Sequence, residues 1–308
     1  MTADAALTGA ASLAELSDHD LDLLLLIRRF EERLLELFAE GAVAGTTHTC
    51  LGQEYIPVAM APLLRDDTVF SNHRGHGHYL AHVGDLHALL AEILGRVGAV
   101  CKGVGGSQHL RAERFISTGV QGENIAAAAG VALHLRHAEL PGVAAVYLGD
   151  GSWGEGVVYE TLNIARLWGL PLLVIVEHNG IAQSTPTDRH MAGTVADRAA
   201  AFGIGCDQIT DTDVIAIRRR LEAVVQRVRA DRMPHVVVFH TVRLGPHSKG
   251  DDTRPPAERA DLAAADWLSY YTTHIPRRVR DADARARALV DAAVADVRAR
   301  QPSSWSPT

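Results

Sequence analysis

Three short, continuous apolar runs stand out along the chain: VAAVYL at 143–148, PLLVIV at 171–176 and HVVVFHTV at 235–242. Their length and their lack of polar alternation are typical of strands that are buried on both faces of a parallel sheet. Between them, residues 155–168 and 213–230 repeat apolar side chains at helical spacing, with polar residues interleaved. The order strand, helix, strand, helix, strand predicts an α/β fold with a doubly wound, mostly parallel sheet and helices on both faces.

The regions on either side of this pattern are predicted to be mostly helical. Residues 18–40 form an amphipathic pattern, 123–135 form a helix rich in small residues, and TVFSN at 68–72 is typical of a short strand. After about Pro255, the sequence predicts a terminal helix with a polar face and a frayed end. No repeat or low-complexity linker divides the chain. Residues 1–308 are therefore expected to form a single domain, with helical segments at about 13–45 and 260–308.

Composition and charge narrow the classes of partner. The 308 residues are 47% apolar, and 30 basic against 37 acidic residues give a net charge of −7. This balance offers no electrostatic footprint for nucleic acid or an anionic membrane, so small-molecule or protein partners are favoured. The run LDLLLLI at 21–27 is far shorter than the roughly 20 residues that span a membrane. The three cysteines form no CxxC pattern, which fits a cytoplasmic protein.

Two polar residues follow the first two predicted core strands. Asp150, between two glycines, comes after 143–148, and Asn179 comes after 171–176. Ligands of open parallel sheets bind beyond the carboxyl ends of the strands, and neighbouring strands lie about 4.8 Å apart, so both side chains can converge on one cation. Oxygen ligands favour Mg²⁺, which commonly adds phosphate oxygens and water. Either motif alone is an ordinary turn, but their joint spacing predicts a magnesium-bound phosphorylated ligand.

The same residues resemble the alpha subunit of thiamine-diphosphate-dependent 2-oxo-acid and acetoin dehydrogenases. The thiamine-diphosphate signature, GDG followed by a long spacer and an Asn, is present as GDGSWGEGVVYETLNIARLWGLPLLVIVEHNG. Four further segments are similar and follow the order of the family: THTCLGQEY at 47–55, SNHRGHGHYLAHVGDLHALLAEILGR at 71–96, KGVGGSQHL at 102–110 and RLGPHSKGDDTR at 243–254. The resemblance implies the thiamine-diphosphate-binding fold, with thiamine diphosphate and Mg²⁺ as cofactors.

The resemblance implies roles for individual residues in binding the cofactor and the metal. Asp150 and Asn179 match the two side-chain ligands of magnesium, and the backbone carbonyl of Ile181 matches a third ligand. Arg74 matches an arginine that holds the diphosphate, for which a guanidinium is well suited, and His247 matches a histidine near the same phosphates. The implied cofactor-binding set is Arg74, Gly149, Asp150, Gly151, Asn179, Ile181, Gln183 and His247.

His48 and His76 match active-site positions of the family, so the candidate catalytic residues are His48, His76 and His247. A zinc cluster among the histidines of 48–87 is not favoured, because HRGHGH lacks a fixed-face helical spacing and no cysteine nearby joins it. His82 and His87 are expected to be solvated helix residues. The loop at 245–254 is expected to become ordered only when the cofactor binds.

Glu54 invites a different assignment, since thiamine enzymes activate their cofactor with a glutamate. In the resembled family that glutamate comes from the beta subunit, and Glu54 is expected to begin a helix instead.

Three departures from the family bear on the substrate. Thr46 replaces a large aromatic residue frequent in relatives that use pyruvate, Gln183 replaces Met, Leu or Ile beneath the bent cofactor, and His73 replaces a frequent Tyr. These changes suggest a roomier or more polar pocket without identifying the substrate.

The implied function is that of an oxidoreductase alpha subunit that decarboxylates a 2-oxo acid, or cleaves an acyloin, and transfers the acyl group to lipoamide. A beta subunit would complete the active site in an α2β2 heterotetramer, with 123–135 a candidate for close subunit contact and a lipoyl-bearing acyltransferase as a further partner. Two alternatives stay open: the diphosphate-binding half of a split transketolase-like transferase or carboligase, and a non-catalytic stabilising subunit. EHNGIAQSTP and PHSKGDD argue against the first, and the intact cofactor residues argue against the second.

Overall fold

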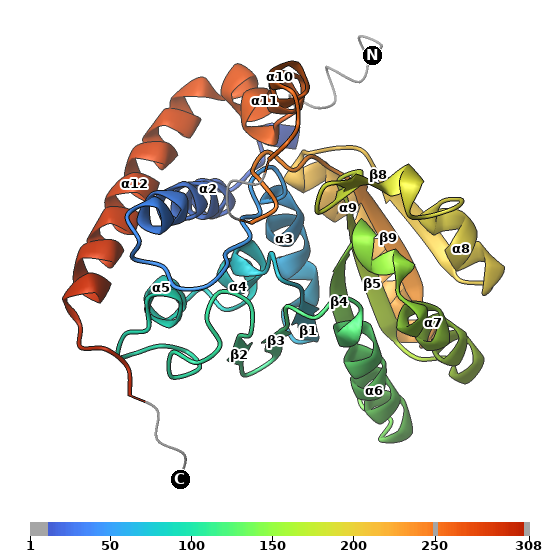
Figure 1. The fold of residues 1–308 in the computed structure, drawn as a ribbon. Helices are drawn as coiled ribbons and strands as arrows, with labels where there is room; N and C mark the ends of the chain where they lie inside the picture. Colours follow the sequence, from blue (N-terminus) through green and yellow to red (C-terminus); the bar gives the residue numbers. More distant parts are fainter. Residues whose placement is uncertain (1–11, 249–251, 305–308) are drawn as a thin grey trace.

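A computed structural model describes residues 12–248 and 252–304, which are built around a seven-stranded sheet (Figure 1). The strand order is β2-β3-β1-β4-β5-β9-β8. All neighbouring pairs are parallel except β2 with β3, so the predicted doubly wound, mostly parallel α/β fold is confirmed. The strands are β1 (Thr68–Ser71), β2 (Arg111–Ala112), β3 (Phe115–Ser117), β4 (Ala144–Gly149), β5 (Leu172–His178), β8 (Gly205–Ile209) and β9 (His235–His240).

The predicted strands agree with the structure, but the connection between the last two core strands differs. The apolar runs form β4, β5 and β9, and the segment at 68–72 forms β1. The predicted direct crossover from β5 to β9 is wrong, because a short hairpin of β6 (Ile181–Ala182) and β7 (Thr185–Pro186), a helix and strand β8 intervene. The sequence of β8, GCDQI, contains no apolar run. It is an edge strand and leaves much of its surface in solvent, so the apolar pattern of a buried strand is absent.

Helices cover both faces of the sheet (Figure 1). The alternation of strand side chains explains how this is achieved, since Leu173 and Ile175 of β5 face one apolar cluster and Val174 and Val176 face another. The predicted helices at 18–40, 123–135, 155–168 and 213–230 are confirmed. The helices N-terminal to residue 250 are α2 (Asp18–Ala39), α3 (Tyr55–Met60), η1 (Ala61–Leu64), α4 (His76–His82), α5 (Leu86–Leu94), α6 (Glu123–His137), η2 (Asp150–Gly154), α7 (Gly156–Trp168), η3 (Thr187–Arg189), α8 (Val195–Ala201) and α9 (Val214–Asp231).

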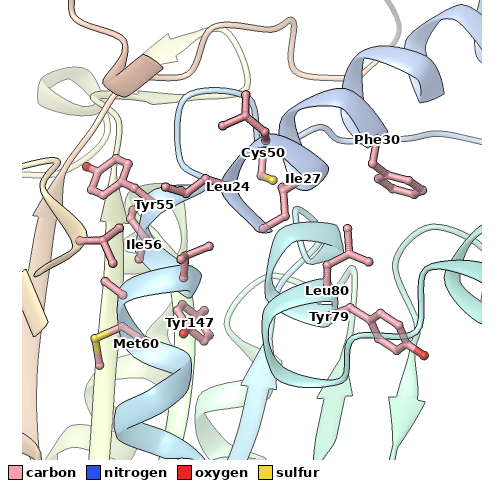
Figure 2. Packing of buried hydrophobic residues seen from close by; sticks show 14 of the residues in the cluster. Leu24, Ile27, Phe30, Cys50, Tyr55, Ile56, Met60, Tyr79, Leu80 and Tyr147 are labelled. Atoms are coloured by element: carbon pink, nitrogen blue, oxygen red, sulfur yellow. The ribbon is translucent and has the colours of Figure 1, made fainter. Parts of the chain in front are cut away.

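The larger apolar cluster joins α2, α3 and α4 to one face of the sheet. Figure 2 shows side chains from these three helices gathered around the same space as Tyr147 of β4. The cluster includes Leu24, Ile27 and Phe30 of α2, Tyr55, Ile56 and Met60 of α3, and Tyr79 and Leu80 of α4, together with Cys50 and Tyr147. This packing fixes the loop before α3 and the start of α4 against the sheet, and both segments contribute to the site described below.

The C-terminal segment is more elaborate than the single polar-faced helix predicted from the sequence. It forms α10 (Pro256–Ala264), α11 (Trp267–His274) and α12 (Pro276–Ala299). Asp266 caps α11 through its side chain, and Pro276 starts α12, so each local signal begins a new helix. A face of α12 is buried against α2 (Figure 1). The prediction of a single domain over residues 1–308 stays a prediction.

Candidate functional site

A cavity of about 650 Å³ opens beyond the carboxyl ends of β1, β4, β5 and β9. This volume lies within the usual range for small-molecule sites. Segments that follow the four strands contribute to its wall, and the loop before α3 adds His48 and Gln53. The cavity lining includes every residue predicted to bind the cofactor: Arg74, Gly149, Asp150, Gly151, Asn179, Ile181, Gln183 and His247.

Asp150 lies at the floor of this cavity, directly after β4. Strands β4 and β5 are parallel neighbours, with Gly149 opposite Glu177, so the segments that follow both strands begin side by side, while their sharing of one cation stays a prediction. The Asp150 side chain is 2% exposed. Its Oδ2 accepts hydrogen bonds from the Gly180 amide at 3.0 Å and from the Thr187 hydroxyl, and it lies 3.0 Å from His178 Nδ1.

These contacts decide the charge of Asp150. Burial alone would raise the pKa of its carboxyl, but the hydrogen bonds from His178, Thr187 and Gly180 outweigh burial and hold the pKa below its ordinary value. Asp150 is therefore an ionised carboxylate at neutral pH. All of these bonds go to Oδ2, and no residue within 12–248 or 252–304 donates to Oδ1. The second oxygen is thus available to a cation in the cavity.

Asn179 completes the polar floor after β5. Its Nδ2 donates to Gln53 Oε1 at 3.1 Å, and its Oδ1 accepts from the Ile181 amide at 3.2 Å. The backbone amide of Ile181 can only donate, so this bond fixes which end of the carboxamide carries the oxygen. Close to both residues, a Cβ added to Gly151 would lie 2.9 Å from the Cβ of Ala182. A side chain at position 151 would therefore crowd the β6–β7 hairpin where it borders the cavity.

Two buried arginines form the positive side of the cavity. Arg74 is 4% exposed, donates to the Thr49 carbonyl at 2.8 Å and lies 3.1 Å from His247 Nδ1. Arg243 is 3% exposed and donates to the Gln183 carbonyl at 3.0 Å. Burial, together with the charge of Arg243, lowers the pKa of Arg74 to about 10. Two guanidinium groups in one buried wall favour an anionic ligand that can accept hydrogen bonds from both.

Arg243 was not predicted from the sequence, although a signal was present. It follows the third predicted core strand at 235–242 in the same way that Asp150 and Asn179 follow the first two. A basic residue at the carboxyl end of a parallel strand could therefore have been included with them.

Three histidine rings lie together on the cavity wall. The His48 ring centroid is 4.8 Å from that of His73 and 4.7 Å from that of His247. Burial, followed by the charge of Arg74, holds the pKa of His73 well below its ordinary value, so this ring is neutral at neutral pH. In the described part of the chain, no group of three or more His, Cys, Asp or Glu side chains has the arrangement of a metal centre.

The other predicted histidines do not all join the site. His76 is fully buried at the start of α4, where Nδ1 lies 3.0 Å from Glu31 and Nε2 lies 2.8 Å from the Ser107 hydroxyl. It does not line the cavity, so the structure separates it from His48 and His247. The prediction that His82 is solvated is wrong, because its ring bonds to the Tyr147 hydroxyl and burial lowers its pKa to about 3.

Glu54 begins α3, as expected, and points away from the cavity into a buried polar network. Its carboxylate pairs with Arg28 and accepts from the Gly52 amide at 2.8 Å and from Trp267 Nε1 at 2.6 Å. Arg28 also makes two hydrogen bonds to Asp266, at 2.8 and 2.9 Å. The network ties the loop that carries His48 and Gln53 to helices at both ends of the chain.

The family departures also have defined surroundings. Gln183 lines the cavity with a φ of 51°, in the left-handed region that ordinary residues rarely adopt. Thr46 does not line the cavity, but its hydroxyl accepts from Gln108 Nε2 at 3.0 Å, and Gln108 does line it. The predicted ordering loop at 245–254 is described except for residues 249–251, and its response to cofactor stays a prediction.

The donors and acceptors of the cavity fit thiamine diphosphate with Mg²⁺. Asp150 offers an ionised oxygen and Asn179 an oriented carboxamide, which are hard oxygen ligands of the kind that Mg²⁺ prefers. Arg74 and Arg243 offer the charge and the hydrogen bonds that a diphosphate requires. The two groups of residues line the same cavity, as a metal-bound diphosphate would need.

Comparison with known proteins identifies the family. The model of the "Dehydrogenase E1 component" family matches residues 23–300. The alpha subunit of acetoin:2,6-dichlorophenolindophenol oxidoreductase from Bacillus subtilis is 35% identical over 230 residues, which are 73% of this chain and 69% of the relative. The pyruvate dehydrogenase E1 component alpha subunit of Zymomonas mobilis is 36% identical over 237 residues, 75% of this chain and 67% of the relative. That of Rhizobium meliloti is 35% identical over 253 residues, 79% and 72% of the two chains. The chain thus belongs to the dehydrogenase E1 component family, among the alpha subunits of thiamine-diphosphate-dependent 2-oxo-acid and acetoin dehydrogenases.

Proposed function

We propose that this chain is the alpha subunit of a thiamine-diphosphate- and Mg²⁺-dependent oxidoreductase that decarboxylates a 2-oxo acid, or cleaves an acyloin, and passes the acyl group to lipoamide. One observation carries the proposal. A single cavity is lined by the ionised carboxylate of Asp150, whose Oδ1 accepts no hydrogen bond from the described residues, and by the buried side chains of Arg74 and Arg243. Membership of the E1 family supports it. The bound cofactor supplies the nucleophilic carbon and the electron sink needed to break a bond beside a carbonyl.

Within this function, the chain's own residues bind and orient the phosphate end of the cofactor. Asp150, Asn179 and the carbonyl of Ile181 would hold Mg²⁺, since they supply oxygen ligands at adjacent points of the floor. Arg74 and His247 would hold the diphosphate, and we add Arg243 to this set. Each arginine is already fixed by a bond to a backbone carbonyl, so little side-chain freedom remains to be lost on binding.

The histidines divide by position. His48 and His247 stand on the cavity wall, and we propose that they are the histidines that contact ligand there. His73, kept neutral by burial and by Arg74, would offer a hydrogen bond without adding positive charge. His76 contacts Ser107 and Glu31 behind the wall, so its proposed role is to support the neighbouring segments rather than to touch substrate.

The active site would be completed by a beta subunit. Among the described residues, the carboxylates lining the cavity are Asp150, Glu155 and Glu177. Hydrogen bonds within the chain hold Asp150 and Glu177, while Glu155 is exposed. We therefore propose that the glutamate that activates the cofactor comes from the beta partner, as the family resemblance implies.

Two neighbouring helices offer surfaces for the proposed α2β2 assembly. The exposed positions of α6 include the small residues Ala126, Ala127 and Gly130, which permit close approach of another helix. On α7, Leu167 is 74% exposed and Trp168 is 47% exposed, which is unusual for large apolar side chains.

A lipoyl-bearing acyltransferase would be the acyl acceptor, and the proposed setting is the cytoplasm. Within the described residues, no helix has the length and apolarity to cross a membrane.

Reconstitution with the beta subunit tests the proposed function. Consumption of 2-oxo acids is followed with an artificial electron acceptor, over short, branched and hydroxylated substrates and acetoin. We expect no enzymatic turnover by the 308-residue chain alone, because loss of general acid–base assistance typically costs about 10²–10⁴-fold. Addition of the beta subunit should restore turnover and give a heteromer larger than one αβ pair. Robust turnover by the single chain would refute the shared site. Cofactor binding without turnover in the complex would favour a non-catalytic subunit.

A further inference from the structure

Glu177 is a buried carboxylate on the cavity wall that the proposed function does not use. It lies near the end of β5 and is 2% exposed. Strand alternation puts it on the same face as Leu173 and Ile175, toward α4. One oxygen, Oε1, lies 3.0 Å from His78 Nε2, and the other, Oε2, accepts from Asn72 Nδ2 at 2.9 Å. Both oxygens are therefore held within the protein.

Asn72 links Glu177 to Arg74 through two hydrogen bonds. Its Nδ2 donates to Glu177, and its Oδ1 accepts from the backbone amide of Arg74 at 2.8 Å. The two ends of the carboxamide have opposite hydrogen-bonding character, so a flipped Asn72 would lose both bonds. Asn72 is 6% exposed, which leaves little access for water to replace either partner. The carboxylate of Glu177 thus fixes the orientation of Asn72, and Asn72 holds the amide of Arg74.

The other side of Glu177 is anchored just as firmly. His78 bonds to Glu177 through Nε2 and lies 2.7 Å from the Ser71 hydroxyl through Nδ1, and its ring stacks on Tyr147 at 3.9 Å. Ser71 ends β1 and Tyr147 belongs to β4, so these contacts fix the position of the Glu177 carboxylate relative to the sheet. A chain of contacts therefore runs from two strands, through His78, Glu177 and Asn72, to the segment that carries Arg74.

We propose that Glu177 and Asn72 form a positioning pair that sets the backbone of Arg74, so that its guanidinium meets the cofactor diphosphate in one fixed orientation. This inference rests on the proposed role of Arg74 in diphosphate binding. Glu177 is a positioning residue here and not a catalytic acid. Both of its oxygens are engaged by Asn72 and His78, which leaves neither oxygen directed at the cofactor.

Simple electrostatics predicts the opposite effect, which makes the inference testable. Glu177 is negative and lies near enough to Arg74 to raise the pKa of that residue. If its charge alone mattered, removal of Glu177 would make the cavity more positive and would tighten diphosphate binding. If its hydrogen bonds matter, removal would release Asn72 and Arg74 and would weaken binding.

The experiment is a calorimetric titration of the full chain with thiamine diphosphate in excess Mg²⁺. Asn72→Ala and Glu177→Ala should each bind about tenfold more weakly than wild type, as expected for loss of a hydrogen bond to a charged or buried group. Because both changes break the same chain of contacts, the double variant should lose about tenfold as well, whereas independent effects would multiply to roughly a hundredfold.

Two further variants separate positioning from general damage. Glu177→Gln should restore most of the affinity lost in Glu177→Ala, because a glutamine oxygen can still accept from Asn72 while its amide group faces His78. Asp67→Ala is the matched control. Asp67 is 3% exposed and accepts from the Val143 amide at 2.7 Å, but it precedes β1 at the opposite end of the sheet. This control should lower Tm without changing the affinity.

The outcomes distinguish the inference from the proposed function. If wild type does not bind thiamine diphosphate, the assignment of the cavity fails first. If wild type binds and both alanine variants bind equally well or more tightly, the positioning pair is refuted while the cofactor site stands. A multiplicative loss in the double variant, or an equal loss of affinity in Asp67→Ala, would also overturn it.

Discussion

Replacement of Arg28 by methionine tests the buried network that holds the cavity loop in place. Arg28, on α2, is 4% exposed and pairs with Glu54 and with Asp266, which are themselves buried. The guanidinium also lies 5.1 Å from the centre of the Trp267 ring. Methionine keeps much of the length and volume of the side chain but removes its charge and all of its donors. Two carboxylates would then share a buried site without a cation.

The expected loss of stability is large. Removing one partner of a buried ion pair typically costs about 3–5 kcal/mol, because the remaining charge stays buried and uncompensated. The lost cation–π contact adds about 0.5–2 kcal/mol at most. Glu54 keeps its bonds from Gly52 and Trp267, which favours the lower end of this range. A loss of about 3–4 kcal/mol corresponds to a fall in Tm of roughly 5–6 °C for a chain of 308 residues.

The pH dependence of the loss identifies its cause. Burial raises the pKa of the Glu54 carboxyl and Arg28 counteracts this, so without Arg28 the folded-state pKa of Glu54 lies further above its unfolded value of about 4. The folded state then retains protons that the unfolded state releases, so the stability of the variant falls as pH rises through the folded-state pKa. The deficit relative to wild type should therefore be smaller at pH 5 than at pH 8. Differential scanning calorimetry at both pH values measures it.

Arg219→Met provides the matched control for this measurement. Arg219 pairs with Glu15 at the surface, where both side chains are more than half exposed, and such pairs contribute about 0–1 kcal/mol. Its Tm should barely change at either pH. If Arg28→Met is no less stable than Arg219→Met, or if its deficit does not grow with pH, then the pairing of the buried charges does not account for the stability of the network.

Two further predictions concern the cavity. Asp150→Asn should weaken Mg²⁺-dependent binding of thiamine diphosphate at least tenfold, because it removes a charged ligand, and calorimetry over a series of Mg²⁺ concentrations measures this. Asparagine is preferred to alanine, which would leave the donors of His178, Gly180 and Thr187 without this acceptor and lower the stability too. Arg243→Met should reduce the affinity by about tenfold or more while Arg219→Met leaves it unchanged; equal affinities would remove Arg243 from the diphosphate site.

The sequence predicts the centre of the fold well and its edges poorly. Strands β4, β5 and β9 are buried on both faces, which requires apolar side chains at successive positions, so each strand is visible in the sequence as a continuous apolar run. Strand β8 pairs with a neighbour on only one side, and the sequence GCDQI keeps no such run. The C-terminal helices show the same limit, because Asp266 and Pro276 divide a segment whose composition is uniformly helical.

Site residues were predictable where a strand end places them. Asp150 and Asn179 follow neighbouring strands, and geometry brings such positions together whatever the rest of the chain does. The supporting network could not be found in this way. Arg28 meets Asp266 across 238 positions, and Glu177 meets Asn72 across 105, with no local pattern to indicate either pair. Only the packing of the helices against the sheet makes them neighbours.

The charged residues of the cavity fall into two groups: those that would contact the ligand and those that hold the first group in position. Arg74 faces the cavity and bonds to the Thr49 carbonyl and to His247, while Oδ1 of Asp150 accepts no hydrogen bond from the described residues, so neither charge is fully matched within the described part of the chain. Glu177, in contrast, has both oxygens bound by protein partners. Unmatched charge is costly in a buried site unless a ligand of opposite charge arrives. A diphosphate carrying Mg²⁺ has anionic oxygens that could pair with Arg74 and a cation that could pair with Asp150, so one bound species would relieve both costs.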